Sequence, residues 1–406
     1  MPSPDAPLPE GAERHGQALA VLLSDGAGAF LSSALEPMRV RLRSFRASQV
    51  RYVPGKSVIV QYQAEVTSDR GRPLKTTYVA ASGIRVPEEV PVFAADGLEI
   101  AFWEFPNDPF LPGLAPATDP DRVRRLLERL GAPSQPVQLH TRAYRATRRA
   151  VVEASGRSQR MFLKVVRPET VATLQARHTE LAAHVPVPHS FGWSEEMGIV
   201  ALQAMSGRTL SRAVTARSRH LPNGASLDSL LDRFPEPALG TRVVAGPHEV
   251  AEEHARLLRA VLPDLSRRID GIVGRLEAVG GEARCAVHGD FHSSQILIDK
   301  SDVVGLVDVD TAGAGERVND LANVLGHLSV MGLSSPARSD IDLYGGSLIS
   351  DFDQRVDPVG LRLRVAGVVL GLATGPFRVQ LSKWPAETEA RIALAERWID
   401  SAESLR

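Results

Sequence analysis

The stretch from Val287 to Ala322 constrains what this chain can fold into more than any other part of it. A short apolar run, residues 285–287, stops at the turn His288-Gly289-Asp290. Two further apolar runs, at 296–298 and 303–307, flank a polar segment that is typical of a hairpin turn. Ordinary turn aspartates would explain the acids within that segment. They would not explain a His-Gly-Asp turn followed by a hairpin that ends in further acids.

Oxygen ligands gather at one mouth of this predicted hairpin. Gln295 precedes its first strand, Asp308 and Asp310 follow its second, and the preceding turn supplies Asp290. Such a set suits Mg²⁺, which prefers hard oxygen ligands and keeps several waters for nucleotide phosphates. Phosphoryl transfer needs this arrangement, because a carboxylate orients the attacking hydroxyl while a metal holds the phosphate oxygens. The stretch therefore predicts a magnesium-assisted phosphoryl-transfer site.

The residues HGDFHSSQIL, followed by VDVD at 307–310, resemble the catalytic and metal loops of the aminoglycoside phosphotransferase and choline kinase family. This resemblance implies an α+β, two-lobed protein-kinase-like fold and ATP as the phosphoryl donor. It makes Asp290 the catalytic residue that accepts or orients the hydroxyl proton. Gln295 and Asp308 would hold Mg²⁺, and Asp310 would bind a second ion or the acceptor. Gln295 stands where the common form has Asn, which resembles the branch of bacterial maltokinases and glucosamine kinases.

The 406 residues are enough for several domains. Residues 1–15, rich in Pro, Ala and Glu, are expected to form a flexible tail. An additional N-terminal cap domain would follow at 16–135, then a small nucleotide-binding lobe at 136–206 and a helical catalytic lobe at 207–406. The resemblance covers about 140–326 well, and the first 135 residues only loosely.

The cap repeats the strand pattern of the small lobe, so the cap is a candidate degenerate copy of it. Residues 52–60 and 77–81 line up with residues 144–152 and 161–165. In this alignment Lys164 of the second copy matches Ala80 of the first. Only the second copy could therefore place an ammonium group against nucleotide phosphates.

Lys164 lies in an apolar strand, where an unpaired charge would be costly and a phosphate partner makes sense. Its strand resembles the phosphate-binding lysine strand of kinases, although an edge-strand lysine reaching water is the alternative. Arg148 occupies the turn where kinases have a glycine-rich loop, and would contact phosphate or simply lie on the surface. The backbone from Gln203 to Met205 would meet the adenine edge, or else end a buried strand.

The acidic partner of Lys164 is left open by the sequence. Kinases place a glutamate on the next helix, here residues 170–181. Glu180 is the first candidate and Glu169 the second, while His178 or Gln175 could occupy the place instead. Asp320 is expected to cap a later helix, and the resemblance implies that it braces the catalytic loop.

Composition excludes several other classes of protein. The net charge is −1, which argues against a nucleic-acid or membrane-surface binder with a basic face. Cys285 is the single cysteine, so no intrachain disulfide can form. The N-terminus has no basic region followed by an apolar one, and no stretch is expected to supply the roughly 20 apolar residues of a membrane helix. The protein is expected in the cytoplasm, with neither nucleic acid nor membrane as a partner.

The acceptor is expected to be a small molecule, most simply a sugar or amino sugar. Acidic residues crowd positions 340–357, and aromatic residues lie in the same region: Tyr344, Phe377, Trp384 and Trp398. Carboxylates could bind sugar hydroxyls or an ammonium group, and aromatic faces suit a pyranose or a cation. The alternative is a solvated acidic surface with tryptophans in the core. An aminoglycoside-type antibiotic kinase, a choline-type kinase and a nucleotide-binding pseudokinase remain rival hypotheses.

Overall fold

A computed structural model describes residues 12–24, 26–68, 71–95, 97–134, 138–156, 159–235 and 242–406. It divides into two compact units. Unit 1 comprises residues 1–172, 191–202 and 377–382, and unit 2 comprises residues 173–190, 203–376 and 383–406. Residues 1–11 of the predicted tail, and the predicted cap boundary at residue 135, lie outside the described residues.

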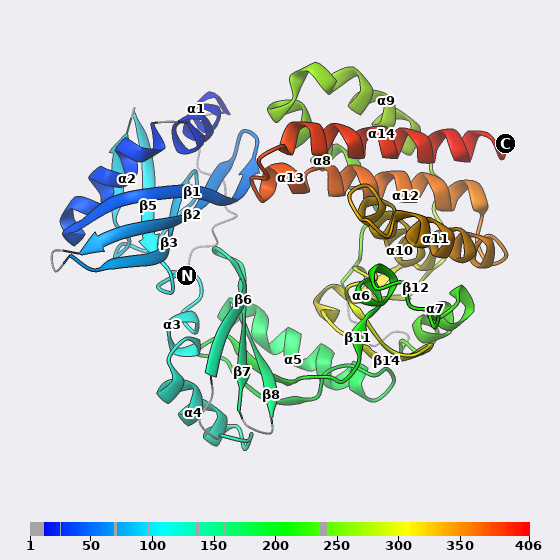
Figure 1. Cartoon of the computed structure of the whole chain (residues 1–406), viewed down its shortest axis with the longest axis horizontal. Helices are drawn as coiled ribbons and strands as arrows, with labels where there is room; N and C mark the ends of the chain where they lie inside the picture. The colour runs from blue at the N-terminus through cyan, green and yellow to red at the C-terminus, as the bar shows by residue number, and fades with distance from the viewer. Residues whose placement is uncertain are drawn as a thin grey trace. The chain divides into compact units, whose positions relative to one another are not determined.

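Unit 1 is built around two five-stranded sheets that share one strand order (Figure 1). The first runs β1 (Val40–Val53), β2 (Ser57–Ser68), β3 (Pro73–Ser82), β5 (Leu98–Glu104) and β4 (Val92–Ala95). The second runs β6 (Gln138–Arg145), β7 (Arg149–Ser155), β8 (Arg160–Val166), β10 (Ile199–Gln203) and β9 (Ser190–Ser194). Each sheet thus places its fifth strand between its third and fourth, as a duplication would.

The first hairpin of each sheet closes with the same turn. Its middle residue is left-handed in both copies, with φ of 74° at Gly55 and 65° at Thr147. Glycine adopts this conformation readily, whereas a β-branched residue such as threonine is strained by it. The strand ends pair in the same way on either side, as Val53 with Ser57 and as Arg145 with Arg149. These turns support the predicted internal repeat.

The strand register changes one detail of that repeat. Lys164 pairs with Val151, and the residue equivalent to Val151 is Ile59, which pairs with Ala81. Lys164 therefore corresponds to Ala81, one residue beyond the Ala80 expected from the alignment. The consequence is unchanged, because neither alanine can supply an ammonium group.

A single hydrophobic core joins the two sheets of unit 1. Ile59 and Val79 of the first sheet belong to the same buried cluster as Val152 and Leu163 of the second. Helices α3 (Leu114–Ala117) and α4 (Pro120–Arg129) add Leu114, Leu126 and Leu127 to it. Each such side chain contributes about 1.5–3 kcal/mol on burial, so the cap and the second sheet stabilise each other. The N-terminal helices are α1 (Ala12–Leu23) and α2 (Ala27–Leu35), followed by η1 (Glu36–Met38).

Unit 2 is mostly helical, as expected for a catalytic lobe. Its helices are α6 (Leu210–Thr215), α7 (Gly224–Leu231), α8 (Ala251–Val261), α9 (Ser266–Leu276), α10 (Arg317–Gly332), α11 (Arg338–Phe352), α12 (Pro358–Ala373) and α14 (Trp384–Glu403). Helix α5 (Pro168–Ala182) divides between the units, as does α13 (Gly375–Arg378). Short 3₁₀ turns, η2 (Pro263–Leu265) and η3 (Val309–Thr311), complete the described helical elements of this part.

Two small sheets in unit 2 carry the motif stretch. One is β11 (Arg208–Thr209), β13 (Ile296–Asp299) and β14 (Asp302–Leu306), and the other is β12 (Arg284–Val287) with β15 (Gly313–Glu316). Helix α10 packs against β12 and β15, and α12 packs against α10. Most of α12 is buried, including its two arginines, Arg362 and Arg364. The catalytic motif therefore rests on a rigid helical core.

One segment departs from the expectation that no stretch could cross a membrane. Pro358–Arg378 is long and apolar enough by length and composition, and a bent pair, Gly16–Leu23 with Ala27–Met38, passes the same test together. However, 72% of the most apolar 18-residue stretch in the first segment is buried inside the protein, as expected of a core helix.

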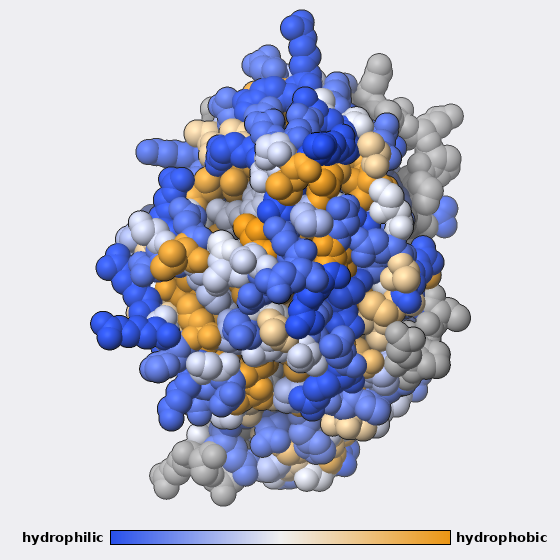
Figure 2. Space-filling model, turned by 90° about the vertical axis from the view of Figure 1, so that its right-hand side faces the viewer, coloured by the Kyte–Doolittle hydropathy of each residue, from blue (hydrophilic) through white to orange (hydrophobic). Residues whose placement is uncertain are grey.

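The face shown in Figure 2 is mainly hydrophilic, with apolar residues in separate patches.

Candidate active site

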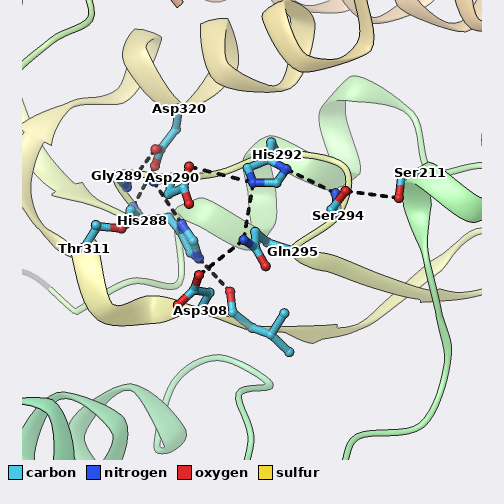
Figure 3. A network of polar contacts seen from close by, with 11 residues as sticks. Ser211, His288, Gly289, Asp290, His292, Ser294, Gln295, Asp308, Thr311 and Asp320 are labelled. Carbon is cyan, nitrogen blue, oxygen red and sulfur yellow. Dashed lines mark hydrogen bonds and ion pairs between the residues drawn. The ribbon is translucent and has the colours of Figure 1, made fainter. Parts of the chain in front are cut away.

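The predicted hairpin forms and brings its two expected metal ligands together. Strands β13 and β14 pair antiparallel, and Lys300 closes their turn in a left-handed conformation. The Val307 amide donates to the Gln295 carbonyl at 2.9 Å, which extends the ladder by one step. The side chains of Gln295 and Asp308 consequently lie side by side, with Nε2 and Oδ2 3.5 Å apart (Figure 3).

Asp320 holds the turn that carries Asp290. Its carboxylate accepts the backbone N–H of His288 at 2.7 Å and that of Gly289 at 2.9 Å. The expectation that Asp320 caps its own helix was wrong, because α10 begins at Arg317 and Asp320 lies inside its first turn. The fully buried carboxylate instead fixes the loop, as the resemblance implied.

His288 connects the catalytic turn to the metal loop. It is fully buried, and its Nε2 lies 3.1 Å from the carbonyl oxygen of Val307, which can only accept a hydrogen bond. Nε2 therefore carries the proton, and Nδ1 accepts the Asp290 amide at 3.2 Å. Burial lowers the pKa of His288 to about 4, so the ring stays neutral and keeps this tautomer. The His288 ring thus holds the catalytic turn at Asp290 and the metal loop at Val307 at a fixed distance from each other.

Asp290 stands beside two stacked histidines. Its carboxylate is 39% exposed and lies 3.8 Å from His292 Nε2, while the rings of His292 and His327 are parallel with centroids 3.9 Å apart. These groups are close enough to be considered as a metal site. However, the lone pairs of parallel rings lie in parallel planes and do not converge on one ion. We therefore assign the pair to packing and hydrogen bonding beside the catalytic carboxylate.

The tautomer of His292 also bears on Gln295. His292 Nδ1 accepts the Ser294 amide at 3.3 Å, so its Nε2 carries the proton and needs an acceptor. The amide group of Gln295 lies 3.3 Å from that Nε2. Its oxygen and nitrogen exchange places by a half-turn, and only the hydrogen-bond pattern distinguishes them. With the oxygen facing His292, that oxygen also faces Asp308.

This arrangement fits Mg²⁺. Cis oxygen ligands of an octahedral Mg²⁺ lie roughly 3 Å apart, close to the separation of Gln295 and Asp308. Asp308 adopts a left-handed backbone, φ 59° and ψ 47°, which aspartate tolerates better than most residues and which often marks a functional site. Gln295 and Asp308 would hold the ion, with Asp310 two residues further on. When bound, Mg²⁺ neutralises charge on the phosphate oxygens.

The nucleotide-site predictions are distributed over both units. Lys164 is on β8 with 6% of its surface exposed, and Arg148 lies exposed in the β6–β7 turn. Glu180, on α5, is close enough to Arg177 to raise its pKa, although burial lowers that pKa overall. The partner of Lys164 therefore stays a prediction.

The hinge prediction concerns the segment after β10. The Gln203 amide donates to the His189 carbonyl at 2.8 Å, so this N–H is already engaged. Met205 packs against Gly305, where an added Cβ would come within 2.8 Å of its Cε. The residues that follow Gln203, 204–206, are irregular, and the adenine contact stays a prediction.

The acidic and aromatic residues expected at the acceptor site have structural contacts. Asp351 accepts the Gly224 amide, Asp353 pairs with Arg362, and Asp357 caps α12. The hydroxyl of Tyr344 donates to the Pro222 carbonyl at 2.8 Å, and Trp398 packs on the helical core. These contacts favour the alternative of a structured surface.

Two site residues were missed by sequence reasoning. Arg177, on α5, donates to the backbone oxygen of Asp310 and so fixes the end of the metal loop. His327 reaches the site from α10, 35 residues after its stacking partner His292. No local pattern signals either residue, because each acts through a tertiary contact.

The fold and the site together define a phosphotransferase with a protein-kinase-like fold. A sequence model of the phosphotransferase enzyme family matches residues 142–354, which is 213 of the 406 residues. The chain belongs to this family. Membership confirms the expectation of an enzyme that transfers a phosphoryl group with ATP and Mg²⁺ as cofactors.

Several solved structures are similar to this chain. A protein from Ralstonia eutropha described as an aminoglycoside phosphotransferase has a TM-score of 0.50 and 12% identity, over 70% of this chain and 98% of its own. The macrolide 2'-phosphotransferase MphH from Brachybacterium faecium has a TM-score of 0.43 and 15% identity, over 67% and 98%. A thermostable mutant of APH(4)-Ia, in complex with ADP and hygromycin B, has a TM-score of 0.45 and 15% identity, over 68% and 97%. A sequence comparison with functionally curated proteins found no match.

We expect the acid limb of the kcat profile to report on Asp320. Burial raises its pKa to about 6, against the lowering effect of its backbone hydrogen bonds. Below that pH a proton occupies one carboxylate oxygen, which can then no longer accept its N–H. Activity should fall by about tenfold per pH unit at the limiting slope. The pKa values of His288 and His292, both about 4, place their titration lower. An acid limb that persists unchanged in Asp320→Asn would contradict this assignment.

Proposed function

We propose that this enzyme transfers the γ-phosphoryl group of ATP to a hydroxyl of a sugar or amino sugar, in the manner of the maltokinase and glucosamine kinase branch. Gln295 in the metal loop and the strand-rich N-terminal cap support this branch. The observation that carries the acceptor class is a cavity in unit 2 beside the catalytic turn.

This cavity has a volume of about 230 Å³. It borders the backbone at Gly289, immediately before Asp290, and His327, whose stacking partner faces the Asp290 carboxylate. Pockets for drug-sized ligands span roughly 300–1,000 Å³. The cavity is therefore suited to one sugar ring and small for a whole multi-ring antibiotic.

The lining of the cavity favours a neutral polyol. Its walls are aliphatic at Val250, Val368 and Leu372. The polar side chains among them, Asp320 aside, are His254, Asn319, Asn323 and His327. Burial lowers the pKa of His327 to about 3, so its ring is neutral. The one carboxylate in the lining belongs to Asp320, which already accepts the backbone of the catalytic turn. A polycationic aminoglycoside or choline would find little charge to pair with.

In the proposed reaction Asp290 accepts the proton of the acceptor hydroxyl as that oxygen attacks the γ-phosphorus. The bond from the γ-phosphorus to the bridging oxygen breaks, and ADP leaves with the charge of that oxygen. Lys164 pairs with the inner phosphates and offsets that charge. Asp320 and His288 keep the Asp290 backbone in place throughout. The Asp290 carboxylate is 39% exposed, so an acceptor can reach it.

An acceptor panel tests the proposed substrate class. Glucose, glucosamine, maltose, choline, homoserine and kanamycin would each be supplied with ATP and Mg²⁺, and ADP release measured. We expect turnover with one of the first three compounds. Turnover of kanamycin or choline with none on the sugars would overturn the proposal.

Variants of the cavity sharpen this test. Asn323→Ala and His327→Ala should each raise the KM of the accepted sugar by about threefold to tenfold, the effect of losing one neutral hydrogen bond. The KM for ATP should not change. Asn223→Ala is the matched control, because Asn223 caps α7 through the Ser226 amide and is outside the cavity lining. Equal effects of Asn323→Ala and Asn223→Ala on the sugar KM would remove the cavity from its role.

A further inference from the structure

The turn between β6 and β7 is held from outside its own hairpin. This turn, residues 145–149, stands where kinases have a glycine-rich loop over the nucleotide phosphates. It contains Thr147 in a left-handed conformation and fully buried. A φ of 65° strains a threonine, so this conformation persists only where surrounding groups hold it. Groups from the rest of unit 1 must therefore stabilise it.

Asp108 supplies the main contact. This residue belongs to the connection after β5, in the region predicted as the cap, and only 4% of its surface is exposed. Its Oδ2 accepts the Thr147 amide at 2.7 Å and the Tyr144 hydroxyl at 2.9 Å. Its Oδ1 accepts the Phe110 amide at 2.9 Å. Three donors thus converge on one buried carboxylate, and two of them belong to the β6–β7 hairpin.

The remaining polar groups of Thr147 are also bonded from outside the hairpin. Arg167 donates to its carbonyl at 2.8 Å, and Arg51 of the first sheet approaches its hydroxyl at 3.5 Å. Gln61, also of the first sheet, donates to the Tyr144 carbonyl at 3.5 Å. The cap therefore contacts the hairpin backbone through Asp108 and Gln61, and the Thr147 hydroxyl through Arg51.

The corresponding turn of the first sheet shows what the second lacks. There Gly55 takes the left-handed position without strain. In the second sheet that position is a threonine, and Arg148 and Arg149 come directly after it. Where kinases have a glycine-rich loop, this chain has a turn with a strained threonine followed by two arginines. The contacts that hold Thr147 therefore also fix the backbone position of Arg148 and Arg149.

We propose that Asp108 is a positioning residue for nucleotide binding: it fixes the β6–β7 turn so that the guanidinium of Arg148 meets the ATP phosphates. This inference rests on the proposed function, because the turn can contact phosphates only if the protein binds ATP as a kinase does. It gives the cap a catalytic purpose beyond stability. The cap replaces the glycine-rich loop as the device that shapes the phosphate site.

Asp108→Asn is the direct test, with full-length protein and binding measured by calorimetry. An amide has the shape of the carboxylate, but its NH₂ group faces one of the three donors and cannot accept from it. We expect the Kd for ATP with Mg²⁺ to rise about tenfold, the effect of losing one charge-assisted hydrogen bond. The Kd for adenosine should stay within about twofold, because the turn contacts phosphates only.

A control and a second variant keep this test decisive. Asp119→Asn alters a carboxylate of the same region that also accepts two backbone amides, at the start of α4, and should leave both affinities unchanged. Tyr144→Phe removes one donor to Asp108 and serves if Asp108→Asn does not fold. It should weaken ATP about threefold and leave adenosine unchanged.

Two outcomes would overturn the inference. One is an unchanged ATP affinity in folded Asp108→Asn or Tyr144→Phe. The other is an equal loss of ATP and adenosine, which would show general damage to the unit. Wild-type protein that binds no ATP would instead refute the proposed function, so the two failures are distinguishable.

Discussion

Asp290→Asn is expected to lower kcat by roughly two to four orders of magnitude, the usual contribution of general acid–base catalysis. The amide cannot take the proton of the acceptor hydroxyl. The change leaves the turn intact, because the backbone of Asp290 is held by His288 and its neighbours by Asp320. The affinity for ATP should therefore remain near that of the wild type.

Asp299→Asn is the matched control for this variant. Asp299 is exposed at the far end of the β13–β14 hairpin, so it shares the motif but not the site. Its kcat should equal that of the wild type. Steady-state kinetics with a saturating acceptor measure both variants. An Asp290→Asn enzyme within a few-fold of the wild type would remove Asp290 from its catalytic role.

The second large effect is expected at the metal site. Asp308→Ala should abolish the part of ATP binding that depends on Mg²⁺, because it removes the charged ligand of the proposed pair. Calorimetric titration of ATP with and without Mg²⁺ measures this difference directly. Gln295→Asn should retain substantial activity, since both amides offer the same oxygen ligand.

Asp302→Ala provides the comparison for Asp308→Ala. Asp302 is an exposed residue of the same hairpin and pairs with Asp299 at its turn. It should respond to Mg²⁺ as the wild type does. The metal assignment would fail if Asp308→Ala kept the full Mg²⁺ response.

The hairpin and its ligands could be predicted because the information is local. Period-two apolar runs, a polar turn and the residues that flank them determine which side chains share an end. Gln295 and Asp308 therefore lie together as expected. The strand pattern at residues 52–60 and 77–81 was predictable for the same reason, and these residues lie in β1, β2, β3 and the β1–β2 turn.

The remaining parts depend on contacts between distant segments. Nothing in the sequence near Asp320 shows that its carboxylate turns away from its own helix to bind the catalytic turn. His327 and Asp108 likewise act on residues 35 and 39 positions away. The acids at 340–357 illustrate the opposite case, because residues that form caps and ion pairs look the same in a sequence as residues of a binding surface.

A single-turnover experiment shows directly whether the protein transfers the γ-phosphoryl group of ATP to a sugar. The protein would be mixed in excess over ATP labelled at the γ-phosphoryl group, with Mg²⁺ and the sugar accepted in the panel. The label should appear on the sugar in step with ADP, in the wild type but not in Asp290→Asn. ATP that binds, raises the melting temperature and stays intact in the wild type would contradict the account, and would identify a nucleotide-binding pseudokinase instead.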